Sequence, residues 1–156
     1  GKTTLAKIVA KKQKLEFIDI DKNIEKKNSM KISEIFDKKG EAFFRIEEEK
    51  EVLKSLKKNN CVIALGGGAF INKTIREDVL KNAISVWLDV SIKTLNERVK
   101  WNQKRPLLKK DGNAKILKEL YDKRKKIYKL ANHKIICDKL NKEKLAKKII
   151  ALYGKY

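Results

Sequence analysis

The chain has 156 residues, of which 42% are apolar and 38% charged, so it matches one domain that can bury a core rather than a disordered tail. Its longest unbroken apolar runs, 61–65 and 149–153, are far shorter than the roughly 20 residues of a membrane-spanning helix, which excludes a transmembrane protein. The net charge is +20, but the basic residues are mostly Lys and scattered, which favours a solvated surface over a clustered nucleic-acid-binding face.

Four segments have the pattern of β-strands: 15–21 (LEFIDID), 61–65 (CVIAL), 83–88 (AISVWL) and 134–137 (KIIC). CVIAL is a continuous apolar run, which predicts a strand buried on both faces. Helical patterns cover residues 5–12, 24–28, 32–39, 41–58, 73–81, 92–100, 114–130 and 142–153. This alternation predicts an α/β fold with a parallel sheet flanked by helices. Ligands bind at the carboxyl ends of the strands in such sheets, so we expect the chemistry there.

The first four residues, Gly1, Lys2, Thr3 and Thr4, match the second half of the phosphate-binding motif G-x-x-x-x-G-K-[ST]. In such a loop Lys2 would reach the β- and γ-phosphates of ATP and the Thr3 hydroxyl would bind Mg²⁺. The helix N-terminus would also face the phosphates. The alternative is an ordinary frayed helix end. We expect that the sequence begins inside the motif, with one strand and half of the loop missing, and that such a fragment has low activity.

Asp19 and Asp21 follow the first strand pattern, in FIDID. Alternation predicts that both carboxylates lie on one face at the carboxyl end of the strand. Two like charges at one place cost energy unless a metal ion or a substrate hydroxyl compensates them. The alternative is a strand end followed by a helix that Asp21 caps.

Gly66, Gly67 and Gly68 follow directly after CVIAL. A glycine run at the tip of a buried strand lets the backbone approach a ligand closely and offers N–H donors. The alternative is a flexible connector.

Only five of the 40 basic residues are Arg, so each Arg indicates a place where a planar, bidentate donor is needed. Arg45 and Arg124 lie in helical patterns; they are either surface residues in weak ion pairs or a pair that converges on a carboxylate. Arg105 lies in the RPLL segment before an Asp-Gly turn. We expect residues 102–113 to form a lid whose Arg faces the transferred phosphoryl group, the alternative being an ordinary basic loop. His133 is expected to be a packing residue.

The order and spacing of GKTT, FIDID, GE-x-x-FR-x-x-E, LGGGA, RPLL and R-x-x-x-Y-x-x-x-N resemble the shikimate kinase family over essentially the whole chain. The triple glycine and the RPLL lid are the most specific pieces. The resemblance implies a fold like that of nucleoside-monophosphate kinases, in which the first strand and the first half of the phosphate loop are absent from this sequence. It also implies transfer of the γ-phosphoryl group of ATP to the 3-hydroxyl of shikimate.

The resemblance implies a role for each of the motif residues. Lys2 and Thr3 would be the phosphate-binding lysine and the Mg²⁺-binding hydroxyl, and Asp19 would help to hold Mg²⁺ through water. Asp21 would accept the proton of the attacking hydroxyl, or at least orient that hydroxyl. Arg45 and Arg124 would bind the shikimate carboxylate.

Further roles follow from the same resemblance. Gly67 and Gly68 would present backbone N–H groups to the substrate, and Gly66 would shape the turn. Arg105 would be the lid arginine, and Arg98 would pack on adenine. One departure concerns residues 137–143 (CDKLNKE), where many relatives have a proline beside the adenine, so the adenine contact there is left open.

Three other functions are compatible with parts of the sequence. A related small-molecule kinase, such as a gluconate kinase, would keep the phosphate loop but would not need two Arg beside GGG. A basic nucleic-acid-binding module would bind DNA or RNA in a salt-sensitive way and be indifferent to Asp21. An inactive scaffold would fail to bind ATP. The resemblance implies a monomer that binds ATP and a small substrate. We expect a cytoplasmic location, because Cys61 and Cys137 indicate neither a disulfide framework nor a zinc site.

Overall fold

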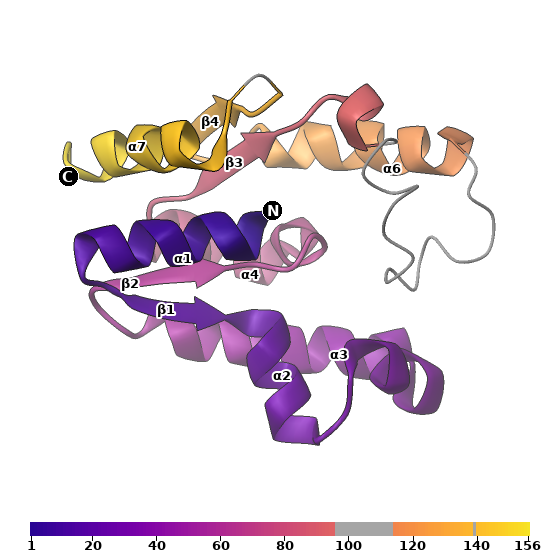
Figure 1. Ribbon diagram of the computed structural model, residues 1–156. Helices are drawn as coiled ribbons and strands as arrows, with labels where there is room; N and C mark the ends of the chain where they lie inside the picture. The colour runs from indigo at the N-terminus through magenta and orange to yellow at the C-terminus, as the bar shows by residue number, and fades with distance from the viewer. Residues whose placement is uncertain (96–113, 139) are drawn as a thin grey trace.

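Four short parallel strands lie at the centre of the computed structural model, which describes residues 1–95, 114–138 and 140–156 (Figure 1). The strands are β1 (Glu16–Asp19), β2 (Cys61–Ala64), β3 (Val86–Asp89) and β4 (His133–Ile136). The pairs β1–β2 and β3–β4 are each parallel and in register to their last residues, which places Asp19 opposite Ala64 and Asp89 opposite Ile136. The parallel α/β prediction is confirmed, with the described strands arranged as two two-stranded sheets.

Six helices and one short 3₁₀ helix surround these strands in the described part of the chain. They are α1 (Lys2–Gln13), α2 (Ile20–Asn28), α3 (Ile32–Leu56), η1 (Ala69–Ile71), α4 (Lys73–Asn82), α6 (Ala114–Tyr128) and α7 (Lys142–Tyr153). Residues 92–95 are also helical, and the remainder of the predicted helix 92–100 lies outside the described residues. The bounds predicted for 142–153 are confirmed. The two predicted helices 32–39 and 41–58 are the two parts of α3, which are separated by a kink at Gly40 (φ 82°).

The prediction of a single strand over 15–21 is wrong at its end, because the strand stops at Asp19 and α2 begins at Ile20. The Asp19 carboxylate accepts a hydrogen bond from the Lys22 N–H at 3.2 Å, so it is Asp19, and not Asp21, that caps the helix. The predicted helix 24–28 is correspondingly one turn too short. Asp21 therefore lies in the first turn of α2 rather than on the strand.

The prediction that CVIAL is buried on both faces is also wrong in part. Only Ala64 of β2 is buried, whereas Cys61, Val62 and Ile63 are half-buried. The reason is that β2 has one hydrogen-bonded neighbour, β1, among the described strands. Its alternate side chains still face two different cores, with Ile63 packing against one and Val62 against the other.

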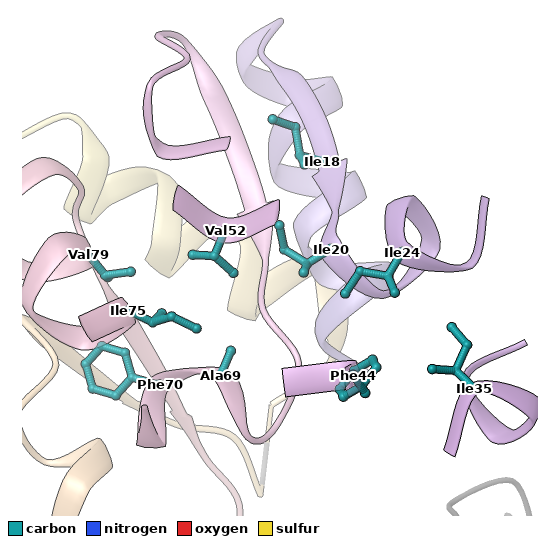
Figure 2. Close-up of a cluster of buried hydrophobic side chains, with 10 residues drawn as sticks. All are labelled: Ile18, Ile20, Ile24, Ile35, Phe44, Val52, Ala69, Phe70, Ile75 and Val79. Atoms are coloured by element: carbon teal, nitrogen blue, oxygen red, sulfur yellow. The ribbon is translucent and has the colours of Figure 1, made fainter. Parts of the chain in front are cut away.

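The two cores lie on opposite faces of the strands. The first core joins β1 to α2, α3, η1 and α4, and consists of Ile18, Ile20, Ile24, Ile35, Phe44, Val52, Ala69, Phe70, Ile75 and Val79 (Figure 2). The second core joins α1 to β4 and α7, and consists of Leu5, Val9, Ile135, Cys137, Leu145 and Ala146. Burial of such side chains contributes about 1.5–3 kcal/mol each, so the two cores fix the helices around the strands.

The carboxyl ends of all four strands and the N-terminus of α1 lie on the same side of the molecule (Figure 1). Backbone pairing in the parallel registers brings the segments after β1 and β2 together at this edge. His133, as predicted, has a packing role, at the start of β4, where its ring contacts Tyr156. None of the helices in the described residues is long and apolar enough to cross a membrane.

Candidate active site

The two carboxylates of FIDID take different places at the end of β1. Asp19 is nearly buried, with 8% of its surface exposed, and its side chain caps α2. Asp21 follows in the first turn of that helix. The Asp21 Oδ1 atom is buried and accepts no hydrogen bond from any residue that the structure describes. An unsatisfied buried carboxylate oxygen is costly, so this atom is available to a group that the bound substrate would bring.

The surroundings of Asp21 favour its protonated form. Burial raises the pKa of Asp21 above its ordinary value of 3.8, and the neighbouring charge of Asp19 raises it further, while Lys2 opposes both. A carboxylate that binds protons more readily than usual is a better proton acceptor in catalysis. The influence of Lys2 also shows that the start of α1 lies near Asp21.

Arg45, on α3, is held by two carboxylates from its own helix. Its Nη1 donates to Glu48 Oε2 at 2.7 Å, and its Nε and Nη2 both donate to Glu41 Oε1, at 3.3 and 3.1 Å. Glu41 is exposed, whereas Glu48 is 1% exposed. Because spacings of three and four residues place side chains on one face of a helix, the two carboxylates fix the direction of the Arg45 guanidinium.

Glu48 is a site residue to which the sequence analysis gave no role. Burial raises the pKa of Glu48, Arg45 opposes this, and Asp21 and Arg124 act on it from further away. The available signal was its place three residues after Arg45 in GE-x-x-FR-x-x-E. Two other Glu flank it in the sequence, however, and only the fold shows which of the three points inward.

The triple glycine lies against these charged groups. A Cβ atom at Gly66 would be 2.7 Å from Glu48 Oε1 and 3.0 Å from Asp21 Oδ1, and one at Gly68 would be 2.4 Å from Arg45 Nη1. Real Cβ atoms essentially never lie closer than 3.0 Å to such a neighbour, so a side chain at Gly66 or Gly68 would require the ends of the Glu48 and Arg45 side chains to shift. The backbone after β2 therefore lies directly against these charged groups, while its approach to a ligand stays a prediction.

Arg124 reaches the same glycines from α6. A Cβ atom at Gly67 would lie 3.3 Å from Arg124 Nη1, and Arg124 lowers the pKa of Glu48. The structure thus brings Asp21, Arg45 and Arg124 together around Gly66–Gly68, although they come from three different helices. Two guanidinium groups and one half-buried carboxylate at a glycine turn can bind a small molecule that has both a carboxylate and hydroxyl groups.

The four N-terminal residues form the start of α1. Gly1 is the N-cap, and Lys2, Thr3 and Thr4 make up the first turn, with Thr3 half-buried and the other three exposed. The N-terminal end of a helix of this length carries a partial positive charge. Together with Lys2, this end can bind phosphate groups at the same edge as Asp21.

The described residues contain no group of three or more His, Cys, Asp or Glu side chains that could hold a metal ion, so a magnesium ion beside this helix end would depend on oxygen ligands from the substrate and water as well. Mg²⁺ prefers oxygen ligands, and in nucleotide sites it is held by one or two carboxylates together with phosphate oxygens and water. The Thr3 hydroxyl and the Asp19 carboxylate are such ligands. The unpartnered Oδ1 of Asp21 and the mutual repulsion of Asp19 and Asp21 indicate a place where a cation is favourable.

Three predicted features lie outside the described residues. Arg98, Arg105 and the predicted lid, residues 102–113, fall within the segment 96–113. Their roles remain predictions from the sequence. Near the proposed adenine contact, Asn141 caps α7 and Asp138 accepts a hydrogen bond from the Ser91 N–H.

Comparison with families of known proteins gives one match over nearly the whole chain, to the family model described as "Shikimate kinase", over residues 1–153. A shikimate kinase of Sulfurihydrogenibium sp. is 41% identical over 150 residues, which cover 96% of this chain and 89% of that protein. One of Persephonella marina is 42% identical over 135 residues, covering 86% and 81%.

The fold is similar to that of solved structures with the same description. The shikimate kinase of Acinetobacter baumannii in complex with shikimate superposes with a TM-score of 0.93 and 31% identity, over 99% of this chain and 87% of that one. The enzyme of Aquifex aeolicus superposes with a TM-score of 0.87 and 31% identity, over 99% and 91%.

Proposed function

Since the chain belongs to the shikimate kinase family, we propose that it transfers the γ-phosphoryl group of ATP to the 3-hydroxyl of shikimate, giving shikimate 3-phosphate and ADP. The observation that carries this proposal is the convergence of Asp21, Arg45 and Arg124 on one glycine turn. Shikimate has one carboxylate and several hydroxyl groups, so it needs fixed cationic donors and a carboxylate acceptor in the same small site.

Arg45 and Arg124 bind the shikimate carboxylate. Paired guanidinium groups give charge-assisted hydrogen bonds with fixed geometry, which Lys cannot reproduce. The buried partner Glu48 holds Arg45 in place before the substrate arrives. The N–H groups of Gly67 and Gly68 complete the contacts from the backbone side, and Gly66 shapes the turn, because a side chain at Gly66 or Gly68 would collide with the charged groups.

Asp21 hydrogen-bonds the reacting hydroxyl and takes its proton as the oxygen attacks the γ-phosphorus. The bond from that phosphorus to the bridging oxygen breaks, and ADP leaves with the electron pair. The raised pKa of Asp21 brings it nearer to that of the group it must deprotonate, which favours proton transfer.

Lys2, together with the N-terminus of α1 that Gly1, Thr3 and Thr4 help to form, binds the phosphates of ATP. The Thr3 hydroxyl, and Asp19 through water, would hold Mg²⁺, which would supply positive charge to offset the charge that develops on the transferred phosphoryl group. Phosphoryl transfer spreads negative charge over the γ-phosphoryl oxygens. The positive charge of Lys2 and of the helix end also stabilises this negative charge.

Our proposal extends to the parts of the chain beyond the site. Residues 1–156 form one domain with a lid at about 102–113, in which Arg105 faces the transferred phosphoryl group, and Arg98 packs on adenine. The protein works as a monomer in the cytoplasm and has no nucleic-acid partner. The scattered Lys residues support a solvated surface, because nucleic-acid-binding faces concentrate their charge.

The direct test is shikimate-dependent release of ADP. It uses the chain as given and also the chain preceded by a strand and the first half of a phosphate-binding loop from a relative, here called the extended chain. We expect the extended chain to release ADP only when shikimate is present.

Three results would contradict the proposal. Release without shikimate, or release that requires gluconate instead, would move the assignment to another small-molecule kinase. No release with any polyol, combined with salt-sensitive binding of DNA or RNA, would favour a nucleic-acid-binding module. Failure of the extended chain to bind ATP would favour an inactive scaffold.

A further inference from the structure

We infer that Tyr128 is a positioning residue of this active site, which sets Arg124 and the Gly67 peptide in the arrangement that receives the shikimate carboxylate. The inference rests on the proposed function, because it concerns how the same site binds its substrate. It assigns to Tyr128 no contact with substrate.

The first observation is a hydrogen bond between distant parts of the chain. The Tyr128 hydroxyl, at the end of α6, donates to the carbonyl oxygen of Gly67. The carbonyl of Gly67 and the N–H of Gly68 belong to one planar peptide and point in opposite directions. A fixed Gly67 carbonyl therefore fixes the direction of the Gly68 N–H, which is one of the donors proposed to face the substrate.

The second observation concerns the Tyr128 ring. Its centroid lies 6.4 Å from that of Phe70, in η1, and 6.2 Å from that of Trp87, in β3, and both pairs of rings are tilted. Aromatic pairs at such separations are attractive beyond their buried area. The ring thus packs between η1, which follows the glycines, and β3. This packing fixes the position of the C-terminal end of α6 and the position of the Tyr128 hydroxyl.

The third observation is the place of Arg124 on the same helix. Residues four apart on a helix lie on one face, one turn from each other. Arg124 is four residues before Tyr128, and its Nη1 lies near Gly67. The hydroxyl of one residue and the guanidinium of the other therefore meet the same glycine. Rotation or sliding of α6 would break the first contact and move the second.

In the part of the chain that the structure describes, α6 makes two other contacts that bear on its position near the site. Its C-terminal end packs on the first core through Ile127 and Tyr128, and Tyr121 reaches Asp89 through a longer hydrogen bond of 3.4 Å. Ile127 fixes no polar group, and Tyr121 lies two turns away from Tyr128. The Tyr128 hydroxyl is the contact that couples the angle of the helix to the glycine turn.

The test is Tyr128→Phe in the extended chain, which removes one oxygen and keeps the ring. We expect the KM for shikimate to rise roughly threefold to tenfold, the size that one net hydrogen bond gives. We expect kcat to change less than about twofold and the KM for ATP to stay the same. The matched control is Tyr121→Phe, which makes the same chemical change on the same helix and should leave the KM for shikimate unaltered.

A second measurement separates positioning from general loosening. In an Arg124→Lys background, Tyr128→Phe should raise the KM for shikimate by a smaller factor than it does in the parent, because groups that act through one another are not additive. The thermal midpoint of each variant is measured alongside. A purely structural role would lower the midpoint and disturb shikimate and ATP together.

Two results would overturn the inference while leaving the proposed function in place. One is a parent enzyme with shikimate-dependent ADP release and a Tyr128→Phe variant with the same KM for shikimate. The other is full additivity with Arg124→Lys. If the parent itself shows no shikimate-dependent release, the proposed function fails and the inference fails with it.

Discussion

The elements around the two cores carry charge in different ways. Beside the first core, Asp19, Glu47 and Glu48 are buried, and Glu48 forms a 2.7 Å ion pair with Arg45. Around the second core, the described residues contain no buried charged side chain. The ion pair between α1 and α7, Lys12 with Glu143, has 42% and 59% of its side chains exposed.

This difference indicates where the molecule tolerates the cost of desolvating charge. Buried ions lose hydration, and their pairing often only offsets that loss, so they are weak evidence for a stabilising role. These buried carboxylates lie beside the first core, where Asp21, Arg45 and Arg124 are proposed to bind the substrate. The second core supports the shape of the site through apolar packing alone. We therefore expect substitutions of charged residues to have large effects beside the first core and small effects beside the second.

The largest effect is expected for Asp21→Asn. Removing a general base should lower kcat by roughly 10²- to 10⁴-fold, with a much smaller change in the KM for shikimate, because the amide can still accept a hydrogen bond. The check is steady-state ADP release by the extended chain, with Asp37→Asn, an exposed acid on α3, as the control. Equal kcat values for Asp21→Asn and the parent would remove Asp21 from the catalytic residues.

The same substitution should stabilise the protein, and the sign follows from the raised pKa of Asp21. The native state holds this proton more tightly than the unfolded state, so the parent loses stability as pH rises from the ordinary value of 3.8 through the folded-state pKa. Asp21→Asn does not titrate. We expect its thermal midpoint to exceed that of the parent near pH 7 by roughly 2–4 °C, for about 1 kcal/mol, and the gap to close near pH 4. A gap that widens on acidification would contradict the sign.

Arg124→Ala is expected to come next. Loss of a cation that pairs with a desolvated carboxylate costs roughly 2–5 kcal/mol, which corresponds to a fall in kcat/KM for shikimate of about 30- to 5000-fold. The KM for ATP should hardly change. The neighbouring Lys123, which is exposed, provides the control Lys123→Ala. A comparable loss in the control would mean that net charge on α6, and not a specific contact, controls binding.

Glu48→Gln tests directly whether the buried ion pair beside the first core matters for substrate binding. Hydrogen bonds to charged groups are worth about 1.5–3 kcal/mol, so we expect the KM for shikimate to rise roughly 10- to 100-fold as Arg45 loses its fixed direction. Glu47→Gln is the matched control, because Glu47 is the preceding residue on α3 and is also buried, but it pairs with Lys27 at 2.7 Å and not with Arg45. Similar KM values for the two variants would show that position on the helix, and not the Arg45 contact, matters.

The smallest effect is expected beside the second core, for Lys12→Ala. This change removes the exposed pair with Glu143, and such surface pairs contribute about 0.2–1 kcal/mol. The free energy of unfolding, measured by denaturant titration, should fall by less than about 1 kcal/mol, and kcat/KM should stay within about twofold. A larger loss of activity would contradict the expectation that substitutions of charged residues have small effects beside the second core.

The sequence predicted the parallel α/β order, and the motif residues Asp21, Arg45 and Arg124 are indeed brought together. The order of strands and helices could be predicted because periodicity is a local property, whereas the convergence of the three residues was implied by the family resemblance. The approach of the Gly66–Gly68 backbone to a ligand was predicted from the place of these glycines after a strand, and it stays a prediction. The same local information gave the bounds of α7, whose cap, Asn141, is visible in the sequence.

What could not be predicted depends on contacts between distant segments. Glu47, Glu48 and Glu49 look alike in the sequence, and only packing of α3 against β2 and α2 decides that Glu48 meets Arg45. The end of β1 was misplaced because strand alternation continues into Asp21, whereas the Asp19 cap turns the chain into a helix. The division of the strands into two sheets is a tertiary property with no signal in a single strand.

The glycine turn limits which amino-acid substitutions this protein can accept at residues 66–68. Every single-nucleotide change in a glycine codon that gives another amino acid introduces a Cβ atom. At Gly66 and Gly68 that atom would meet the ends of the Glu48 and Arg45 side chains, which would have to shift and so disturb the ion pair that joins them. Gly67, with its nearest contact at 3.3 Å, is less confined. Natural or drug-selected escape from an inhibitor seated on this turn is therefore expected at Gly67 or elsewhere in the chain rather than at Gly66 or Gly68.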